Sequence, residues 1–466
     1  MENNRRKSKK GTVFFLILFT ILILLLGGVV FVWSLGGEQK IIVAQKLSDT
    51  ITKATRFLPL EGDLKKEMEV ANDIFQEISK VDDVSRRYLL LLQNNMELRP
   101  GGGFLGQYVV VVVKNGRIEK IYFEDANLLD QRIRVKVTPP YPLTRKLQIK
   151  KWKFRDSNFS PDFPENVKQA KRFFGYSGRN NKFDGVFAIN ATVLNHLLAI
   201  TGPITLKGGY TYNSENAISK LEEQVEKPYL FNENLNTQNR KWIMKRLTEA
   251  LKDRLVSFKN IPQLIDFARE ELSSKNVQLN FQNPDLQKKV AEVKWSGEVN
   301  KDWDGDFLMF VDANLGALKS DFFVKRSIDY NVDLSVDPPL AIVDYKYDHQ
   351  ATRGDWRTSD YHSYLRLYIP DGSKFLKRTM VTYPVVRKEF NKTYFGVYLD
   401  AVMGRVTTAH FEYNLPTTIK DDYRLLIQKQ SGLESLPVHV HLKDKDGKEY
   451  DYTGEVKNEL LLEFRN

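Results

Sequence analysis

The chain has 466 residues, with 70 Lys and Arg against 59 Asp and Glu, a formal net charge of +11 and no cysteine. The absence of cysteine excludes disulfide bonds and thiolate chemistry. The sequence also contains neither the G-x-S-x-G motif of many hydrolases nor the H-E-x-x-H motif of zinc proteases. A chain of this length exceeds what one hydrophobic core usually serves, so we expect two domains.

The N-terminus has the pattern of a membrane anchor. Five basic residues between positions 5 and 10 precede an uncharged segment whose apolar core, residues 13–33, is long enough to cross a bilayer as a helix. The positive-inside rule predicts a cytoplasmic tail at 1–12, and no A-x-A cleavage site follows the apolar run. We therefore expect a retained signal anchor at 13–33, with the bulk of the protein outside the cytoplasm.

The predicted membrane topology limits which partners the net positive charge of the chain can attract. The tail supplies +4, from five basic residues less Glu2, so the remaining chain carries +7 of the net +11. Nucleic acid is excluded as a partner by location. A basic exported part beside a lipid bilayer suggests anionic wall polymers or lipid phosphates as partners.

Residues 38–84 show helical periodicity, with breaks at Pro59 and Gly62. They form either a stalk above the membrane or the first helices packed onto the globular part, and the pattern leaves both open.

The centre of the chain is a strand, a glycine-rich turn and a hairpin. Tyr88–Leu92 is an apolar run, and Val109–Val113 leads to an Asn115-Gly116 turn and a second β-type run. This is a strong hairpin signal, and the valine run predicts a strand covered on both faces. Gly101, Gly102 and Gly103 lie at the turn beside Arg99.

The glycines formally match G-x-G-x-x-G, but no helix opens after them, which excludes a dinucleotide fingerprint. Two alternatives remain for Arg99 and the turn: an anion site made of backbone N–H groups and a guanidinium, or a tight turn with Arg99 in a structural salt bridge.

A second polar block follows a Pro-rich loop at residues 139–142. It contains Arg155, Asp156, Asn158 and Asp162 just ahead of a predicted helix at 165–174. Ser160 or Asp162 can cap this helix, with Pro164 in its first turn. The alternative is a phosphate site, direct or through Mg²⁺, because that cation takes carboxylate and phosphate oxygens.

The rest of the chain divides into two patterns. A strand at 184–190 and a helix at 191–200 predict a mixed-sheet α/β domain at 85–327, interrupted by a helical insertion at 214–226 and 236–274. Asp302, Asp304, Asp306 and Asp312 lack the glutamate of an EF-hand loop. Short alternating strands from 328 to 466 predict a β-sandwich-like domain that folds independently.

Four blocks, in order between Gln93 and Leu334, resemble a bacterial envelope family known as domain of unknown function 4012. They are QNNMELRPGGGFLGQY, RDSNFSPDFPENVKQAKRFF, FDGVFAINATVLNHLLAITGPI and LMFVDANLGALKSDFFVKRSIDYNVDL. The family has no assigned activity. The layout is also similar to the LytR-CpsA-Psr glycopolymer transferases, which have a membrane anchor, an Arg-bearing strand and loop, and a later D-x-x-x-x-I-N strand.

Two functions follow. In the first, the α/β domain binds or transfers a polyprenyl-phosphate-linked glycopolymer. Arg99, Arg155, Asn158 and Gly101–Gly103 then bind the ligand, and Asp125, Asp156 and Asp162 hold Mg²⁺ or act as base. In the second, the exported part is a non-catalytic scaffold that binds wall polymer or another protein.

Arg99 separates these hypotheses. The ligand-binding hypothesis predicts that Arg99→Ala weakens binding of an anionic lipid-linked sugar by about 1.5–3 kcal/mol and leaves the unfolding midpoint nearly unchanged. The scaffold hypothesis, in which Arg99 and Asp156 are a buried structural pair, predicts a loss of stability instead.

Overall fold

The protein is described here from a computed structural model that covers residues 38–55, 62–206, 209–225, 246–247, 249–251, 254–255 and 260–464. Within these ranges no helix is long and apolar enough to cross a membrane. The predicted tail at 1–12 and anchor at 13–33 lie outside the described residues, as does much of the predicted helical insertion.

The described chain is a mixed α/β structure with a β-rich C-terminal region, and its contacts divide it into two compact units. The first unit contains Met1–Leu92, Gln107–Leu128 and Asn180–Ser296; the second contains Gln93–Gly106, Leu129–Arg179 and Gly297–Asn466. The glycine-rich turn is therefore assigned to the second unit, together with the block at 155–162. The sequence-based boundary at 327/328 divides the chain differently: it predicts two continuous domains, whereas each unit here consists of three segments.

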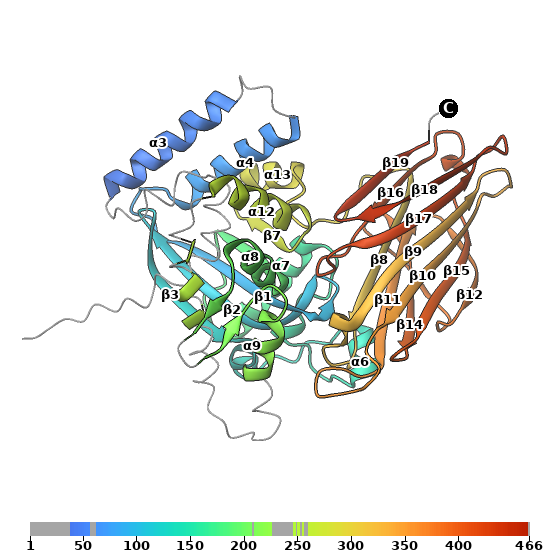
Figure 1. Cartoon of the computed structure of the whole chain (residues 1–466), viewed down its shortest axis with the longest axis horizontal. Helices are drawn as coiled ribbons and strands as arrows, with labels where there is room; N and C mark the ends of the chain where they lie inside the picture. The colour runs from blue at the N-terminus through green and yellow to red at the C-terminus, as the bar shows by residue number, and fades with distance from the viewer. Residues whose placement is uncertain are drawn as a thin grey trace, which may run out of the picture. The chain divides into compact units, whose positions relative to one another are not determined.

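The first unit is built on a five-stranded sheet of order β3-β2-β1-β4-β7 (Figure 1). Its strands are β1 (Arg86–Arg99), β2 (Gly102–Lys114), β3 (Arg117–Asp125), β4 (Gly185–Asn190) and β7 (Val277–Phe281); β1 and β2 continue into residues of the second unit. A small sheet pairs β5 (Ile204–Thr205) with β6 (Thr211–Tyr212). The helices are α3 (Glu38–Thr55), α4 (Gly62–Ile78), α5 (Ala126–Arg132, shared between the units), α8 (Thr192–Thr201), α9 (Ala217–Val225), α12 (Ile261–Ser273) and α13 (Pro284–Glu292).

The predicted hairpin is confirmed. Strands β2 and β3 pair antiparallel, with Lys114 opposite Arg117, and Asn115 and Gly116 both have positive φ, as the tightest hairpin turns require. Of the central valines, Val109 and Val111 are fully buried.

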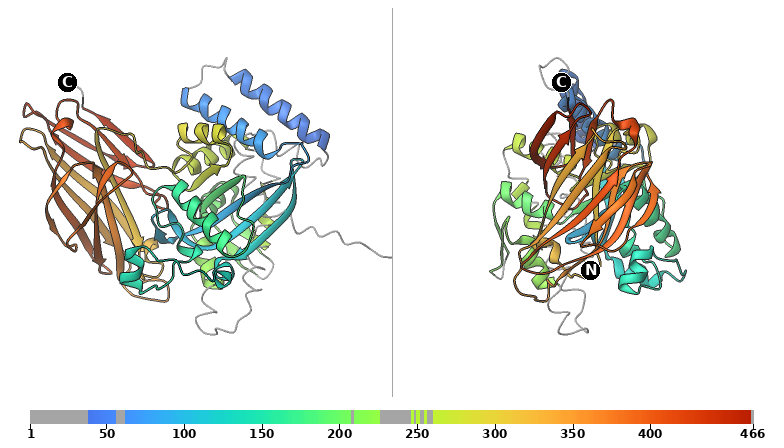
Figure 2. Two further views of the ribbon diagram at one scale, coloured as in Figure 1. Left: turned by 180° about the vertical axis from the view of Figure 1, so that it is seen from behind. Right: turned by 90° about the vertical axis from the view of Figure 1, so that its right-hand side faces the viewer.

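Helices α3 and α4 pack against each other, and α4 packs on α13 (Figures 1 and 2). Ala44, Ile74 and Phe75 enter the same buried cluster as β-strand residues Leu90 and Val111. Helices α3 and α4 are therefore part of the first unit and do not form a free stalk.

The second unit contains two six-stranded sheets that lie face to face (Figures 1 and 2). Their orders are β12-β15-β10-β9-β17-β18 and β13-β14-β11-β8-β16-β19. The strands are β8 (Asp306–Asn314), β9 (Val324–Asp333), β10 (Leu340–His349), β11 (Tyr361–Pro370), β12 (Lys374–Thr379), β13 (Val385–Glu389), β14 (Lys392–Ala401), β15 (Val406–Asn414), β16 (Arg424–Gln428), β17 (Leu436–Lys443), β18 (Glu449–Val456) and β19 (Glu459–Glu463).

The register of this unit is mixed. The pairs β8–β16 and β9–β17 are parallel, whereas β9–β10, β10–β15, β8–β11 and β11–β14 are antiparallel. Strand β8 lies ahead of residue 328 and is hydrogen-bonded between β11 and β16. A fragment that starts at 328 would lack this central strand, so the strand order argues against its independent folding.

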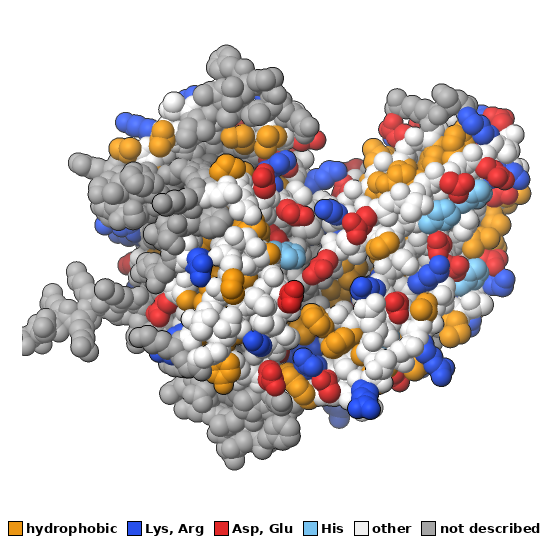
Figure 3. Space-filling model, in the orientation of Figure 1, with side chains coloured by type: hydrophobic (Ala, Val, Ile, Leu, Met, Phe, Trp, Pro, Cys, Tyr) orange, Lys and Arg blue, Asp and Glu red, His pale blue; other side chains and the backbone are white. Residues whose placement is uncertain are grey.

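The outward face of the sheet β12-β15-β10-β9-β17-β18 carries charges of both signs with interspersed histidines (Figure 3). His410 lies 2.7 Å from Asp344, and His441 lies 3.0 Å from Asp451. This mixed, paired composition is that of a solvated sheet face.

Helices α6 (Tyr141–Leu147) and α7 (Phe163–Tyr176) complete the second unit. A buried cluster joins Leu143 and Phe159 to Ala313, Leu315 and Tyr364 of the sandwich. This cluster fixes the 140–160 segment against the strands.

Asp306 is a fully buried carboxyl between the sheets. Tyr330 and Tyr423 each donate an O–H to its Oδ2 at 2.7 Å, yet burial dominates and raises the pKa of Asp306 to about 6. Because the folded pKa lies above the unfolded value, the stabilisation from this carboxyl is complete below about pH 4 and is lost as the pH rises through about 6.

We expect Asp306→Asn to remove this pH-dependent contribution to the free energy of unfolding. Relative to the variant, the wild-type free energy of unfolding should fall by about 3 kcal/mol between about pH 4 and pH 7. Urea titrations across that range measure it, and a difference between the two proteins that does not change with pH would contradict the assignment.

Candidate functional site

The glycine-rich turn is packed against its own neighbours. The N–H of Gly101 donates to the carbonyl of Asn158 at 3.0 Å, so this group is not available to an anion. A Cβ at Gly103 would lie 2.2 Å from the backbone of Asn94, and Gly102 has a φ of 134°. These glycines are therefore required by the close approach of the chain and by the turn itself.

Arg99 is held by internal partners. Its side chain is 4% exposed, and its guanidinium lies 2.9 Å from Glu97 and 3.7 Å from Asp156. Nη1 also donates to the carbonyl of Asn314 at 2.9 Å. Burial opposes the charge, but Glu97 and Asp156 outweigh it, so the pKa of Arg99 is raised. This is the arrangement that the scaffold hypothesis expects.

Arg155 and Asp130 lie beside this pair. Arg155 Nε is 3.0 Å from Asp130, and its side chain is 27% exposed, the most open position of this group. Burial raises the pKa of both Asp130 and Asp156, while the arginines act in the opposite direction. Arg99, Glu97, Asp130, Arg155 and Asp156 thus form one charged group, called here the Arg99 cluster.

The Arg99 cluster therefore brings together three predicted site residues, Arg99, Arg155 and Asp156. Arg99 and Asp156 are buried in it instead of lining an open cleft.

The remaining predicted residues serve other contacts. Asn158 donates from Nδ2 to the carbonyl of Gly103 at 2.7 Å. Asp162 is the N-cap residue of α7, but its side chain makes no capping bond; it accepts from the N–H of Val299 at 3.0 Å and from Lys301 Nζ at 3.2 Å. Asp125 belongs to the first unit, where it accepts from the N–H of Asn127.

The predicted metal site is not supported. Among the described residues, no group of three or more His, Cys, Asp or Glu side chains is placed to hold a metal ion. Within the second unit, Asp156 forms an ion pair with Arg99, and Asp162 forms one with Lys301. They do not form a pair of open carboxylates that could take Mg²⁺.

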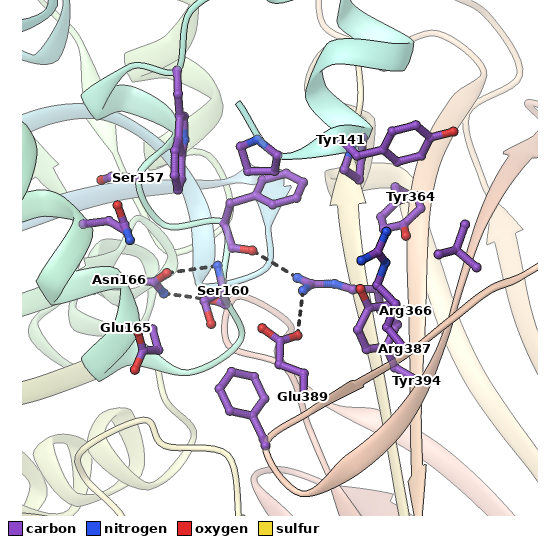
Figure 4. A pocket seen from close by; sticks show the side chains of 17 residues that line it. Tyr141, Ser157, Ser160, Glu165, Asn166, Tyr364, Arg366, Arg387, Glu389 and Tyr394 are labelled. Carbon is purple, nitrogen blue, oxygen red and sulfur yellow. Dashed lines mark hydrogen bonds and ion pairs between the residues drawn. The ribbon is translucent and has the colours of Figure 1, made fainter. Parts of the chain in front are cut away.

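The second unit contains a cavity of about 500 Å³ that sequence reasoning missed (Figure 4). One wall comes from the segment 140–169, and the other from β11, β13 and β14 of the sandwich. It is called here the aromatic cavity, because six aromatic side chains line it: Tyr141, Trp152, Phe159, Tyr364, Phe390 and Tyr394. A cavity of this size accommodates a small organic ligand or a few sugar rings.

Polar groups lie among these rings. Arg366 is 6% exposed; it donates to the carbonyl of Phe159 at 3.1 Å and pairs with Glu389 at 3.4 Å (Figure 4). Burial raises the pKa of Tyr364 to about 12, so its hydroxyl remains a donor at neutral pH. The wall thus offers both charged and neutral hydrogen-bonding groups.

Three buried polar atoms of the cavity lining have no hydrogen-bond partner within the part of the chain that the structure describes. They are Ser157 Oγ, Gln169 Oε1 and Arg366 Nε. Buried polar groups in folded proteins are nearly always hydrogen-bonded, and an exception indicates a missing water, ion or ligand. All three belong to residues of the cavity lining, which makes this wall the place where polar groups remain unsatisfied.

Only weak signals in the sequence point to this cavity. Tyr141 lies in the Pro-rich loop, and the pattern around Tyr364 and Arg366 predicts a strand but no site. The two walls are separated by some 200 residues, so no local motif spans them.

Residues 83–225 match the family model described as "Protein of unknown function (DUF4012)", and the resemblance is confirmed over this segment. No relative was found among curated proteins at a significant level.

Three solved structures show a distant likeness. Lin1025 protein from Listeria innocua is 12% identical with a TM-score of 0.27, covering 46% of this chain and 80% of that one. The putative transcriptional factor Lmo1026 from Listeria monocytogenes is 14% identical with a TM-score of 0.24, covering 46% and 78%. B. subtilis TagV is 15% identical with a TM-score of 0.26, covering 47% and 81%. At such low TM-scores these likenesses carry no weight for the function of this chain.

Proposed function

We propose that this is a cell-envelope protein, anchored in the membrane by residues 13–33, that binds the saccharide part of an envelope polymer in the aromatic cavity. The basic tail and apolar segment support the anchoring, and the family match at 83–225 supports the envelope role. The bulk of the chain is then extracytoplasmic, where wall polymer and the bilayer surface are its partners.

The observation that carries the proposal is the composition of the aromatic cavity. A sugar ring presents C–H groups on its faces and hydroxyl groups at its edge. Aromatic side chains pack against apolar faces, and the hydroxyl groups need hydrogen-bond partners around them. The six aromatic residues match the first requirement, and the polar side chains of the lining, Ser160, Glu165 and Arg387 among them, match the second.

Tyr141 provides the first test, because this residue is 53% exposed and contributes to the cavity wall. We expect Tyr141→Ala to weaken binding of wall-polysaccharide fragments about tenfold while the unfolding midpoint changes little, since an exposed ring contributes little to the core. Isothermal titration of the full chain measures this, in a detergent that has no sugar headgroup.

Tyr383 is the matched control for this experiment. It is 72% exposed and is not part of the cavity wall, so Tyr383→Ala should bind like the wild type. Equal losses in both variants, or no binding of any wall polysaccharide by the wild type, would reject the proposal.

A second candidate is the binding or transfer of a polyprenyl-phosphate-linked glycopolymer at the Arg99 cluster. The observation in its favour is that Arg155, 27% exposed, lies beside two carboxyls, Asp130 and Asp156, whose pKa values burial raises. Carboxyls with a perturbed pKa beside an arginine are common at functional sites. The internal pairing of Arg99 favours the first proposal.

A further inference from the structure

The edge strand β13 presents alternate residues to the aromatic cavity. Val385, Arg387 and Glu389 line it, whereas Val386 and Lys388 do not. This is the period of two expected of a strand, whose successive side chains point to opposite faces. Arg387 therefore lies on the cavity side of β13 (Figure 4).

The charges around the cavity are paired, with one exception among the described residues. Arg366 pairs with Glu389 at 3.4 Å, and Glu165 pairs with Lys168 at 2.5 Å. Arg387 has no carboxylate partner in the described part of the chain. Its positive charge acts on two tyrosines of the cavity lining, Tyr364 and Tyr394, and works to lower the pKa of each.

A second guanidinium lies on the same wall. It belongs to Arg366, which is only 6% exposed and whose Nε has no acceptor among the described residues. The β11–β13 wall therefore carries two guanidinium groups against the single carboxylate of Glu389. A neutral sugar offers this excess positive charge no opposite charge to pair with.

We propose, resting on the proposed saccharide binding, that the ligand is an acidic saccharide whose anionic substituent pairs with Arg387 while its ring packs on the aromatic side chains. A guanidinium fork matches the geometry of a carboxylate or a phosphate, and a charge-assisted pair of this kind is about twice as strong as a neutral hydrogen bond. Carboxylate-bearing and phosphate-bearing sugars share this chemistry.

The test compares each acidic probe with a neutral counterpart, using the full chain in a detergent without a sugar headgroup. The carboxylate arm uses trigalacturonic acid and its full methyl ester; the phosphate arm uses glucose 1-phosphate and methyl glucoside. We expect the wild type to bind the acidic member of at least one pair about tenfold more tightly, and this preference to decline at raised ionic strength.

Arg387→Gln should abolish the preference, and Arg387→Lys should retain part of it. Lys388→Gln is the matched control: it removes the same charge from the neighbouring residue, whose side chain pairs with Asp371 at 2.9 Å and not with the cavity. Arg387 is exposed on an edge strand, so its replacement should leave the unfolding midpoint unchanged.

The outcomes separate the two proposals. A preference in only one arm supports the inference and identifies the anion. If acidic and neutral probes bind equally, or if Arg387→Gln keeps the preference, the acidic-ligand inference is wrong, while a loss in Tyr141→Ala still supports saccharide binding. If neither arm binds, the acidic-ligand inference is wrong; if Tyr141→Ala in addition has no effect on wall polysaccharide, the proposed function itself fails.

Discussion

Replacing Arg326 with alanine is expected to lower the free energy of unfolding by about 3–5 kcal/mol, because it breaks a buried ionic group and leaves two carboxylates without their counter-ion. Arg326 Nε lies 2.8 Å from Asp312, and Nη2 lies 2.6 Å from Asp321. All three side chains are at most 3% exposed, so water cannot replace the lost cation.

The remaining partners of Asp312 cannot compensate. Tyr347 and Ser363 donate hydroxyl groups to Asp312 Oδ1 at 2.8 and 2.5 Å, but they carry no positive charge. Arg326 itself lies over the rings of Tyr347 and Tyr361, so its removal also leaves space between aromatic side chains.

Urea unfolding followed by tryptophan fluorescence measures the effect. Arg357→Ala is the control, since Arg357 pairs with Asp355 at 3.0 Å at the surface, where such a pair contributes at most about 1 kcal/mol. A loss below about 1 kcal/mol in Arg326→Ala would show that the buried group contributes nothing beyond a surface pair.

Arg99→Ala is expected to lower the free energy of unfolding by about 3 kcal/mol or more, in contrast to what the ligand-binding hypothesis predicted from the sequence. The variant removes the cation 3.7 Å from Asp156, a carboxyl whose side chain is 4% exposed. It also removes the donor to the carbonyl of Asn314.

The loss should depend on pH. Burial already raises the pKa of Asp156, and Arg99 acts against that rise, so removal of Arg99 raises the pKa further. The folded pKa then lies above the unfolded one, and the penalty for the unpaired carboxylate is largest at high pH and declines as the pH falls through the folded pKa.

Unfolding titrations of wild type and Arg99→Ala at about pH 7 and about pH 4.5 measure this, and the difference should be smaller at the lower pH. Binding of a polyprenyl phosphate is measured on the same samples. An unchanged unfolding midpoint with lost lipid-phosphate binding would favour the second candidate function over a structural Arg99.

The sequence by itself determined the local elements. The Asn115-Gly116 turn and the valine run fixed the β2–β3 hairpin, because a two-residue turn and a period of two are local properties. The predicted strand and helix at 184–200 correspond to β4 and α8 for the same reason. The alternating runs near the C-terminus likewise predicted a β-rich region.

Only the tertiary structure decided what the polar residues do. Arg99 lies next to Gly101 in the chain, yet Asp156 and Asn314 determine its environment. The spacing of Asp306 and Asp312 superficially suggests a calcium site, but both lie in β8, buried between the sheets, where tyrosine hydroxyl groups donate to them. The aromatic cavity brings Tyr141 to Tyr364 and Arg366, a juxtaposition that depends on how the strands pair. Local patterns encode turns and periodicity, whereas contacts between residues some 200 positions apart depend on the packing of the whole unit, which no short motif records.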